Sequence, residues 1–291
     1  MNTRFVAIAL AGWLVFGAAQ AAPEIERLWE SAPDFLQPES VLFDHDRDLL
    51  FVSNINGGPT EKNGQGFIST VGLDGRIAKL HWLDGLNAPK GMARIGKRLF
   101  VSDIDALVEI DIEAERIVAR YPASDARFLN DLAADDEGRV YVSDMMTNRI
   151  YRLEDGRFEP WVDSPRLAGP NGLAIVGANL YVGCWGAMEA DFSTKVPGHV
   201  LRISLLDRQI TDFGADRPVG NLDGIEAFDD GSLLASDWMA GGLMRIAADG
   251  HVERLDPLAQ GSADIGYDPG SRTVWVPMMK DGKVSAIRIA R

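Results

Sequence analysis

The sequence predicts an all-β protein, a six-bladed β-propeller with four-stranded antiparallel blades, and three observations support this fold. First, a motif recurs six times in which a polar residue opens an apolar run that leads into a Val-Ser-Asp-like step. Second, apolar and polar residues alternate with period two in segments such as "LLFVSN" and "RVYVSD", which indicates strands with two different faces. Third, Asp-Gly and Glu-Gly pairs between these runs indicate hairpin turns, because Gly accepts the positive φ that tight turns need.

The polar residues that open the six motifs, called openers below, define the blades. They are Glu39, Lys90, Asn130, Asn171, Asp223 and Asp264. Successive openers are 51, 40, 41, 52 and 41 residues apart, and a repeat of this length built from short strands is typical of a propeller blade. Because equivalent positions of the inner strands surround the central channel, we expect all six openers to face it.

The first 21 residues have the pattern of a secretory signal peptide. An early Arg4 precedes an apolar stretch from Phe5 to Phe16, and small residues end at Ala21. The alternative, an uncleaved membrane anchor, needs roughly 20 apolar residues, which this stretch does not reach. We therefore expect cleavage near Ala21, a periplasmic or secreted protein, and one propeller domain over residues 22–291, or 45 residues per blade.

The ring is expected to close through its N-terminal strand. The last repeat has only three strands after its opener, and it ends with "KVSAIRIAR". The early segment "EIERLWES" resembles "HVERLDPL", the outer strand of the fifth repeat, so it is the predicted fourth strand of blade six. Such pairing would remove a free sheet edge.

The charge of the chain is strongly negative. Its formal net charge is −14, and it becomes −15 without the first 21 residues because these contain only Arg4. This charge disfavours binding to nucleic acid or to an anionic membrane surface after signal cleavage. A small-molecule substrate is the expected partner, and the sequence does not indicate a protein partner.

Two longer repeats carry insertions at residues 56–66 and 186–198, after the second strands of blades one and four. They are expected to overhang the channel mouth, or else to be surface loops of no consequence. Second strands also end in Met and Trp residues, and Met146, Trp185 and Trp238 are candidate substrate-binding residues at the mouth. The alternative is that these side chains pack between blades.

Four of the openers suggest a metal site. Glu39, Asn130, Asn171 and Asp223 offer two carboxylates and two amide oxygens, which suit Ca²⁺ best and Mg²⁺, Mn²⁺ or Zn²⁺ less selectively. The Ser-Asp steps recur in several blades, so we interpret their carboxylates as acceptors for backbone N–H groups of adjoining turns and not as catalytic groups.

The chain resembles the senescence marker protein (regucalcin), gluconolactonase and luciferin-regenerating-enzyme family of six-bladed propellers. The resemblance extends over the whole chain after the signal peptide and rests on "PESVLFD", "FLNDLAADDEGRVYVSD", "PNGLAI" and "LDGIEAFDDGSLLASD". It implies that Glu39, Asn171 and Asp223 bind one divalent cation directly. Asn130 would contact the cation through water or contact substrate, and Asp223 would be the catalytic general base.

Lys90 and Asp264 depart from the expected metal site. Lys90 either stands clear of the metal, pairs with Glu39 or Asp223 and orients an anionic or carbonyl-bearing ligand, or it occupies the place of the cation and makes the channel a metal-free structural salt bridge. Asp264 adds a third carboxylate, and both residues are candidate substrate-binding groups.

Three functions remain open at this stage. The first is an exported, metal-dependent hydrolase of a lactone or related ester, in which the cation polarises the carbonyl and Asp223 accepts a proton. The second is a non-catalytic propeller that binds a protein or small ligand on the same face. The third is a metal-independent enzyme like the strictosidine-synthase-like propellers, since fold alone does not decide function.

Overall fold

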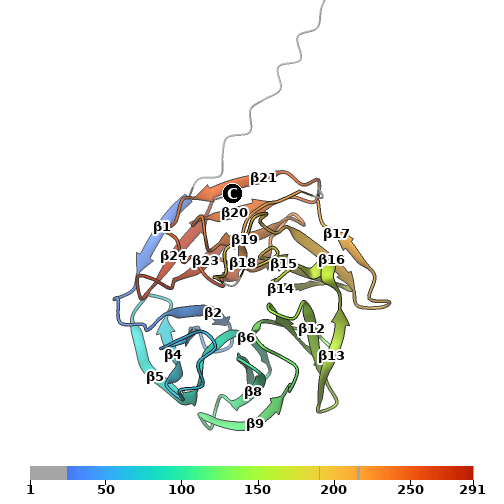
Figure 1. Ribbon diagram of the computed structural model, residues 1–291. Helices are drawn as coiled ribbons and strands as arrows, with labels where there is room; N and C mark the ends of the chain where they lie inside the picture. Colours follow the sequence, from blue (N-terminus) through green and yellow to red (C-terminus); the bar gives the residue numbers. More distant parts are fainter. Residues whose placement is uncertain (1–24, 190, 215–216, 291) are drawn as a thin grey trace, which may run out of the picture.

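The computed structural model describes residues 25–189, 191–214 and 217–290, which form six four-stranded antiparallel sheets arranged as a ring (Figure 1). The signal peptide predicted over residues 1–21 lies outside the described residues. Among the described residues, no helix combines the length and the apolar character needed to cross a membrane.

The first three blades each use consecutive strands, ordered from the channel outwards. Blade one contains β2 (Pro38–Asp44), β3 (Leu49–Asn54), β4 (Gly66–Gly72) and β5 (Ile77–Leu86). Blade two contains β6 (Pro89–Ile95), β7 (Arg98–Asp103), β8 (Ala106–Asp111) and β9 (Arg116–Pro122). Blade three contains β10 (Leu129–Ala134), β11 (Val140–Asp144), β12 (Arg149–Glu154) and β13 (Arg157–Asp163).

The other three blades continue the same order. A single 3₁₀ turn, Pro165–Leu167, leads into blade four, which contains β14 (Pro170–Val176), β15 (Asn179–Cys184), β16 (Val200–Ser204) and β17 (Ile210–Asp212). Blade five contains β18 (Leu222–Ala227), β19 (Leu233–Asp237), β20 (Leu243–Ile246) and β21 (Val252–Asp256). Blade six contains β22 (Gly266–Asp268), β23 (Thr273–Met278), β24 (Lys283–Ile289) and, outermost, β1 (Ile25–Glu30).

The N-terminal strand closes the ring, as the sequence predicted. β1 pairs antiparallel with β24, with Ile25 opposite Ile289 and Glu30 opposite Ser285. In Figure 1 the two strands lie side by side at the rim of the ring. The six-bladed propeller and its closure are therefore confirmed.

The core lies between neighbouring blades. Buried apolar residues of the described chain form six large clusters, each joining side chains from two adjacent sheets. Tyr141 and Trp161 of blade three, for example, pack with Leu180 and Val182 of blade four. These interfaces fix the blades relative to one another, and so they hold the inner strands around a common axis.

Candidate functional site

The openers of blades one to five face the channel because the inner strand of each of these blades is irregular at that point. In blades one to five the pairing register between the first two strands shifts around the opener, for example between Pro38 and Val41 and between Leu129 and Leu132. A β-bulge of this kind re-aims one side chain and leaves a backbone N–H without a ladder partner. It therefore directs the opener towards the axis.

The serine of the Ser-Asp or Ser-Asn step satisfies the backbone at the bulge. Ser53 Oγ accepts the N–H of Ser40 at 3.0 Å, and Ser143 Oγ accepts the N–H of Asp131 at 3.0 Å. In blade five Ser236 Oγ accepts the N–H of Gly224 at 2.9 Å. These hydroxyls thus have a structural role.

Glycine after the opener allows the next inner strand to approach closely. A Cβ added at Gly172 would lie 2.2 Å from the carbonyl oxygen of Asp223, and one added at Gly224 would lie 2.3 Å from the backbone nitrogen of Ile265. Because a side chain does not fit at these distances, the Asn-Gly and Asp-Gly pairs bring Asn171, Asp223 and Asp264 close together around the axis.

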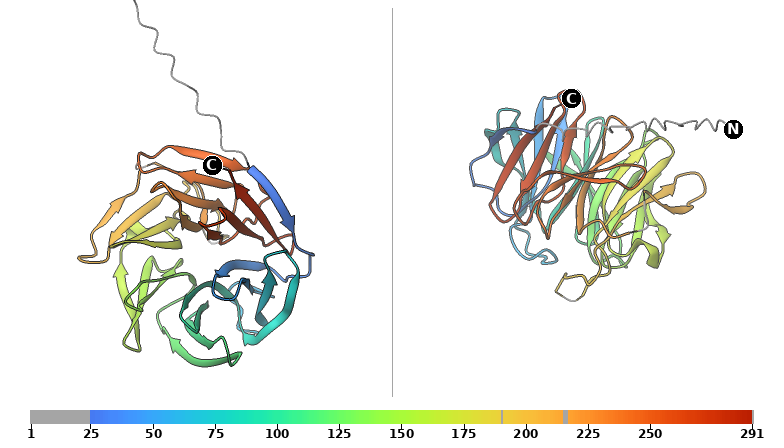
Figure 2. Two further views of the ribbon diagram at one scale, coloured as in Figure 1. Left: turned by 180° about the vertical axis from the view of Figure 1, so that it is seen from behind. Right: turned by 90° about the horizontal axis from the view of Figure 1, so that it is seen from above.

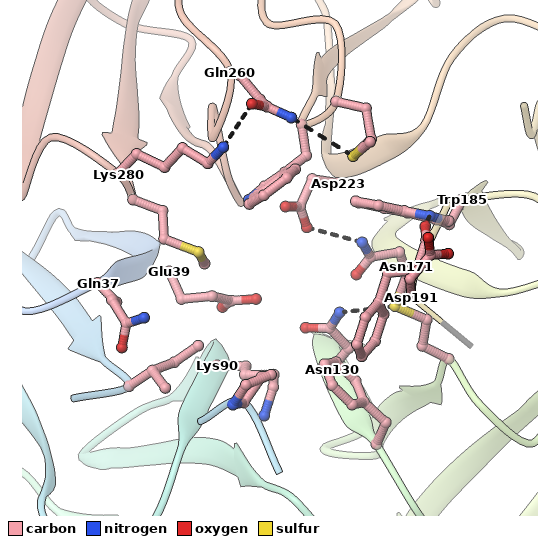
Figure 3. Close-up of a pocket in the computed structure, with 18 of the residues that line it drawn as sticks. Gln37, Glu39, Lys90, Asn130, Asn171, Trp185, Asp191, Asp223, Gln260 and Lys280 are labelled. Carbon is pink, nitrogen blue, oxygen red and sulfur yellow. Dashed lines mark hydrogen bonds between the residues drawn. The ribbon is translucent and has the colours of Figure 1, made fainter. Parts of the chain in front are cut away.

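Five openers line one cavity of about 440 Å³ at the channel mouth (Figure 3). They are Glu39, Lys90, Asn130, Asn171 and Asp223. The side chains of Glu39 and Asn171 point from opposite sides towards a shared central space, and Asp223 lies next to Asn171 (Figure 3). Asn171 Nδ2 donates to Asp223 Oδ1 at 2.9 Å and to the carbonyl oxygen of Leu222 at 3.2 Å.

Two oxygens at this centre are buried without a hydrogen-bond partner among the described residues. They are Glu39 Oε2 and Asn171 Oδ1. Burial, together with the neighbouring carboxyls of Asp223 and Asp264, raises the pKa of Glu39 well above its usual value, although Lys90 opposes this shift. Burial and Asp264 likewise raise the pKa of Asp223 against the effect of the Asn171 hydrogen bond. Buried, unpaired oxygens of this kind fit a cation.

The candidate metal ligands are mixed in type. Among the described residues, no group of three or more His, Cys, Asp or Glu side chains is arranged to hold a metal ion. The donor set here is instead two carboxylates and two amides, which is a combination of hard oxygens suited to Ca²⁺. Asn130 shares this space, and its Nδ2 lies 3.7 Å from Met145 Sδ.

Lys90 lies in the cavity without a salt bridge to any carboxylate of the described residues. Its side chain is only 1% exposed, Nζ donates to the carbonyl oxygen of Ala88 at 2.9 Å, and Nζ lies 4.6 Å from the ring centroid of Phe128. Burial lowers the pKa of Lys90 to about 8, although Glu39 and Asp103 favour the charged form. The described structure thus does not contain the salt bridge that would replace a metal.

Asp264 lies beneath the cavity and does not line it. It forms an isolated β-bridge with Ser40, the residue after the opener Glu39. Asp264 therefore lies at the depth of Ser40 in the channel and not at the depth of Glu39. Its Oδ2 accepts the Ser40 hydroxyl at 2.5 Å, and burial raises the pKa of Asp264 to about 7. Asp131, whose pKa is also raised by burial and by Asp264, accepts N–H groups of Leu132 and Leu173 at 2.6 Å each.

The mouth of the cavity is largely apolar on the side of blades three to five. Trp185 and Trp238 line it as expected, with ring centroids 5.9 Å apart. Met145 lines the cavity in the place expected for Met146, which is 40% exposed and does not line it. The apolar wall is defined by six residues: Phe128, Met145, Trp185, Phe192, Trp238 and Met239.

Both insertions contribute to the rim. Gly57 and Pro59 of the first insertion line the cavity, and so do Asp191 and Phe192 of the second. The side view in Figure 2 shows the two loops extending from the same face of the ring. The expected position at the mouth is therefore confirmed.

Sequence reasoning missed several cavity residues because they lie just outside the strands and belong to no repeat. Gln37 precedes β2, while Gln260 and Lys280 follow β21 and β23.

The carboxylates of the Ser-Asp steps have the role that the sequence predicted. Asp103 accepts backbone N–H groups of Asn87 and Ala88 at 2.9 to 3.1 Å, which fixes the turn before β6.

No family model matches the sequence, and no curated protein does either. Solved structures match in fold. A gluconolactonase from Xanthomonas campestris is 18% identical with a TM-score of 0.68, and the match covers 94% of this chain and 93% of that one. A streptogramin B lyase is 13% identical with a TM-score of 0.65, and the match covers 94% of this chain and 100% of that one.

A further match is a catalytically inactive virginiamycin B lyase from Staphylococcus aureus, solved with quinupristin. It is 14% identical with a TM-score of 0.63, and the match covers 92% of this chain and 99% of that one. Identities this low establish the fold and leave the chemistry to the site. The resemblance indicated by the sequence motifs is thus confirmed in architecture: the chain has a β-propeller fold shared with gluconolactonase.

Proposed function

We propose that the protein is a divalent-cation-dependent hydrolase of a lactone or related ester. The observation that carries the proposal is the pair of buried, unpartnered oxygens, Glu39 Oε2 and Asn171 Oδ1, beside the carboxyl of Asp223. The motif resemblance and the gluconolactonase among the structural neighbours support the same reaction class.

Glu39, Asn171 and Asp223 would hold the cation, with Ca²⁺ the best fit and Mg²⁺, Mn²⁺ or Zn²⁺ as alternatives. Asn130 would contribute through water or bind the substrate. When bound, the cation would supply Lewis acidity for an ester carbonyl and lower the pKa of a nearby water.

The side chains of the cavity would then divide the reaction among them. Asp223 accepts the proton of the attacking water and returns it to the leaving oxygen. Lys90 donates to an oxygen of the substrate, because its ammonium has donors that the protein leaves free. Trp185 and Trp238 cover the reacting ester and limit the access of bulk water.

We also propose that the first 21 residues direct export and are removed near Ala21, which places the protein in the periplasm or outside the cell.

Metal analysis and a lactone panel test the enzymatic proposal. We expect one equivalent of divalent cation in the purified protein, and chelation should lower the melting temperature and abolish hydrolysis. Glu39→Gln and Asp223→Asn should each lower kcat/KM by about 100-fold or more. Asp163→Asn is the matched control, since Asp163 is an exposed partner of Arg149 and does not line the cavity.

Full hydrolysis in both Glu39→Gln and Asp223→Asn would refute the proposed site. Absence of bound cation, together with an unchanged melting temperature on addition of Ca²⁺ or Mn²⁺, would refute metal dependence. Ligand binding in a protein that hydrolyses no lactone would favour the non-catalytic binding propeller.

A further inference from the structure

The lysines of the cavity differ from those elsewhere on the protein in whether they form an ion pair with a carboxylate. The chain has seven lysines. Five of them form ion pairs with carboxylates: Lys62 with Asp105, Lys79 with Glu115, Lys97 with Glu113, Lys195 with Glu189 and Lys283 with Glu30. The other two, Lys90 and Lys280, have no carboxylate partner among the described residues, and both line the cavity.

Lys90 is the deeper of the two cations. An ammonium group has three N–H donors, and the protein supplies Lys90 Nζ with one acceptor, the carbonyl oxygen of Ala88. Its other near neighbour is the face of Phe128. Burial of an ammonium without a counterion is costly. The remaining donors therefore call for an acceptor from a ligand in the cavity.

Lys280 lies at the mouth on the opposite side (Figure 3). Its Nζ donates to Gln260 Oε1 at 2.5 Å and lies 5.1 Å from the ring centroid of Trp238. Both partners are uncharged, so they position the ammonium without neutralising it. In a chain of net charge −14, this leaves a local positive charge at the entrance.

The formal charge of the cavity points in the same direction. Three carboxylates line it, those of Glu39, Asp191 and Asp223, along with the two lysines. With the divalent cation of the proposed function in place, the formal charge becomes +1. A singly charged anion would neutralise the occupied site.

The apolar wall determines the chemical character of the uncharged part of the ligand. Its six side chains lie on blades three to five and offer few hydrogen-bond partners. Trp185 Nε1 is already used, since it donates to the carbonyl oxygen of Phe192 at 2.9 Å. A ligand rich in hydroxyl groups would leave them unpaired against this wall, whereas an alkyl or aryl body would bury apolar surface there.

We propose that the cavity binds an amphipathic carboxylate, with an alkyl or aryl body on the apolar wall and its carboxylate on Lys90. Lys280 attracts the anion at the mouth. The inference rests on the proposed function in using the same cavity and cation, and it makes the hydrolase one that acts on an apolar lactone carrying, or releasing, a carboxylate.

Calorimetric titration of the intact protein loaded with Ca²⁺ tests this inference, with 4-phenylbutyrate as the probe and 4-phenylbutan-1-ol as its neutral match. The acid should bind about tenfold tighter than the alcohol or better, because a hydrogen bond from an ammonium to a carboxylate is about twice as strong as one to a neutral hydroxyl. Acetate, which lacks the apolar body, should bind far more weakly than 4-phenylbutyrate.

Variants locate the carboxylate. Lys90→Met should weaken 4-phenylbutyrate binding by about tenfold or more and leave 4-phenylbutan-1-ol binding within about twofold. Lys280→Met should slow association with the acid. It should also make the association rate less dependent on salt concentration. Lys97→Met is the control, because Lys97 is paired with Glu113 away from the cavity, and it should bind both probes like the wild-type protein.

Equal affinity for acid and alcohol would overturn the inference, and so would a Lys90→Met variant that loses both probes equally while its melting temperature is unchanged. The two proposals fail separately. Binding of 4-phenylbutyrate by a protein that hydrolyses no lactone would refute the hydrolase alone, and hydrolysis without discrimination between the two probes would refute the anion site alone.

Discussion

At the residue level, Asp144 fixes the stretch of chain that leads to Asn130. Its carboxylate accepts three backbone N–H groups, from Arg127 at 3.0 Å, Phe128 at 3.1 Å and Met146 at 3.2 Å. The side chain is fully buried, so no water is at hand to replace it. Asp144 thus positions the cavity residues Phe128 and Asn130 without touching a ligand.

Replacing Asp144 with Ala should lower the free energy of unfolding by about 1–3 kcal/mol, because the buried N–H of Phe128 is left unpaired and such a donor costs about that much. Denaturant unfolding measures this loss. Asp163→Ala, which removes an exposed ion pair with Arg149, should cost less than about 1 kcal/mol. Similar losses in the two variants would mean that Asp144 does not hold the turn.

Single residues also show how much of the site the sequence could predict. Five of the six openers line the cavity because their repeated position fixes their register, and register is visible in a sequence. The choice of Met145 over Met146 was not visible, since both follow the end of β11, where period-two alternation no longer applies. Lys280 and Gln260 were missed for the same reason. Asp264 lies one residue further along the channel than its place in the repeat indicated.

At the level of elements, β1 matters most because it completes blade six. It pairs with β24, and Leu28 and Trp29 pack against the cluster between blades six and one. This closure was predictable from the sequence because two outer strands share a pattern. The Ser hydroxyls that complete the β-bulges were not predictable, since a bulge depends on pairing partners and not on local periodicity.

A variant that begins at Ala32 should lose β1 and expose the edge of β24. Full burial of an apolar side chain contributes about 1.5–3 kcal/mol, so the loss of the partly buried Leu28 and Trp29 should lower stability by about 3 kcal/mol. At about 2–4 °C per kcal/mol for a chain of this size, the melting temperature should fall by about 10 °C. Thermal unfolding checks this value.

The same variant should form oligomers in size-exclusion chromatography, because an unpaired edge recruits other strands. A synthetic peptide of residues 24–31 should restore part of the lost melting temperature. A monomer with the original melting temperature would contradict the role assigned to β1.

At the level of the whole molecule, the central channel concentrates acidic groups that burial keeps protonated. Burial raises the pKa of Asp264 to about 7, and burial together with Asp264 raises the pKa of Glu226 to about 8. In the unfolded chain these groups titrate near pH 4. Their protonated forms therefore favour the folded state, and the stability they contribute is complete below pH 4 and is lost as the pH rises through about 7 to 8.

The stability of the metal-free protein should accordingly decrease between pH 5 and pH 8. Each group contributes a slope of at most about 1.4 kcal/mol per pH unit. Asp264→Asn should flatten this dependence, and denaturant unfolding at several pH values checks both expectations. A pH profile of Asp264→Asn that matches the wild-type profile would show that this carboxyl does not control stability.

In blades one to five the inner-strand bulge places one side chain per blade at the channel mouth, and this has a consequence for how the site can change. The five codons for these residues are 40 to 52 positions apart in the gene, yet the side chains they encode line one cavity. A library that varies only these codons would alter the chemistry of the channel while every hairpin and every blade interface kept its sequence. Each of these five side chains can therefore be exchanged separately without changing the rest of the fold.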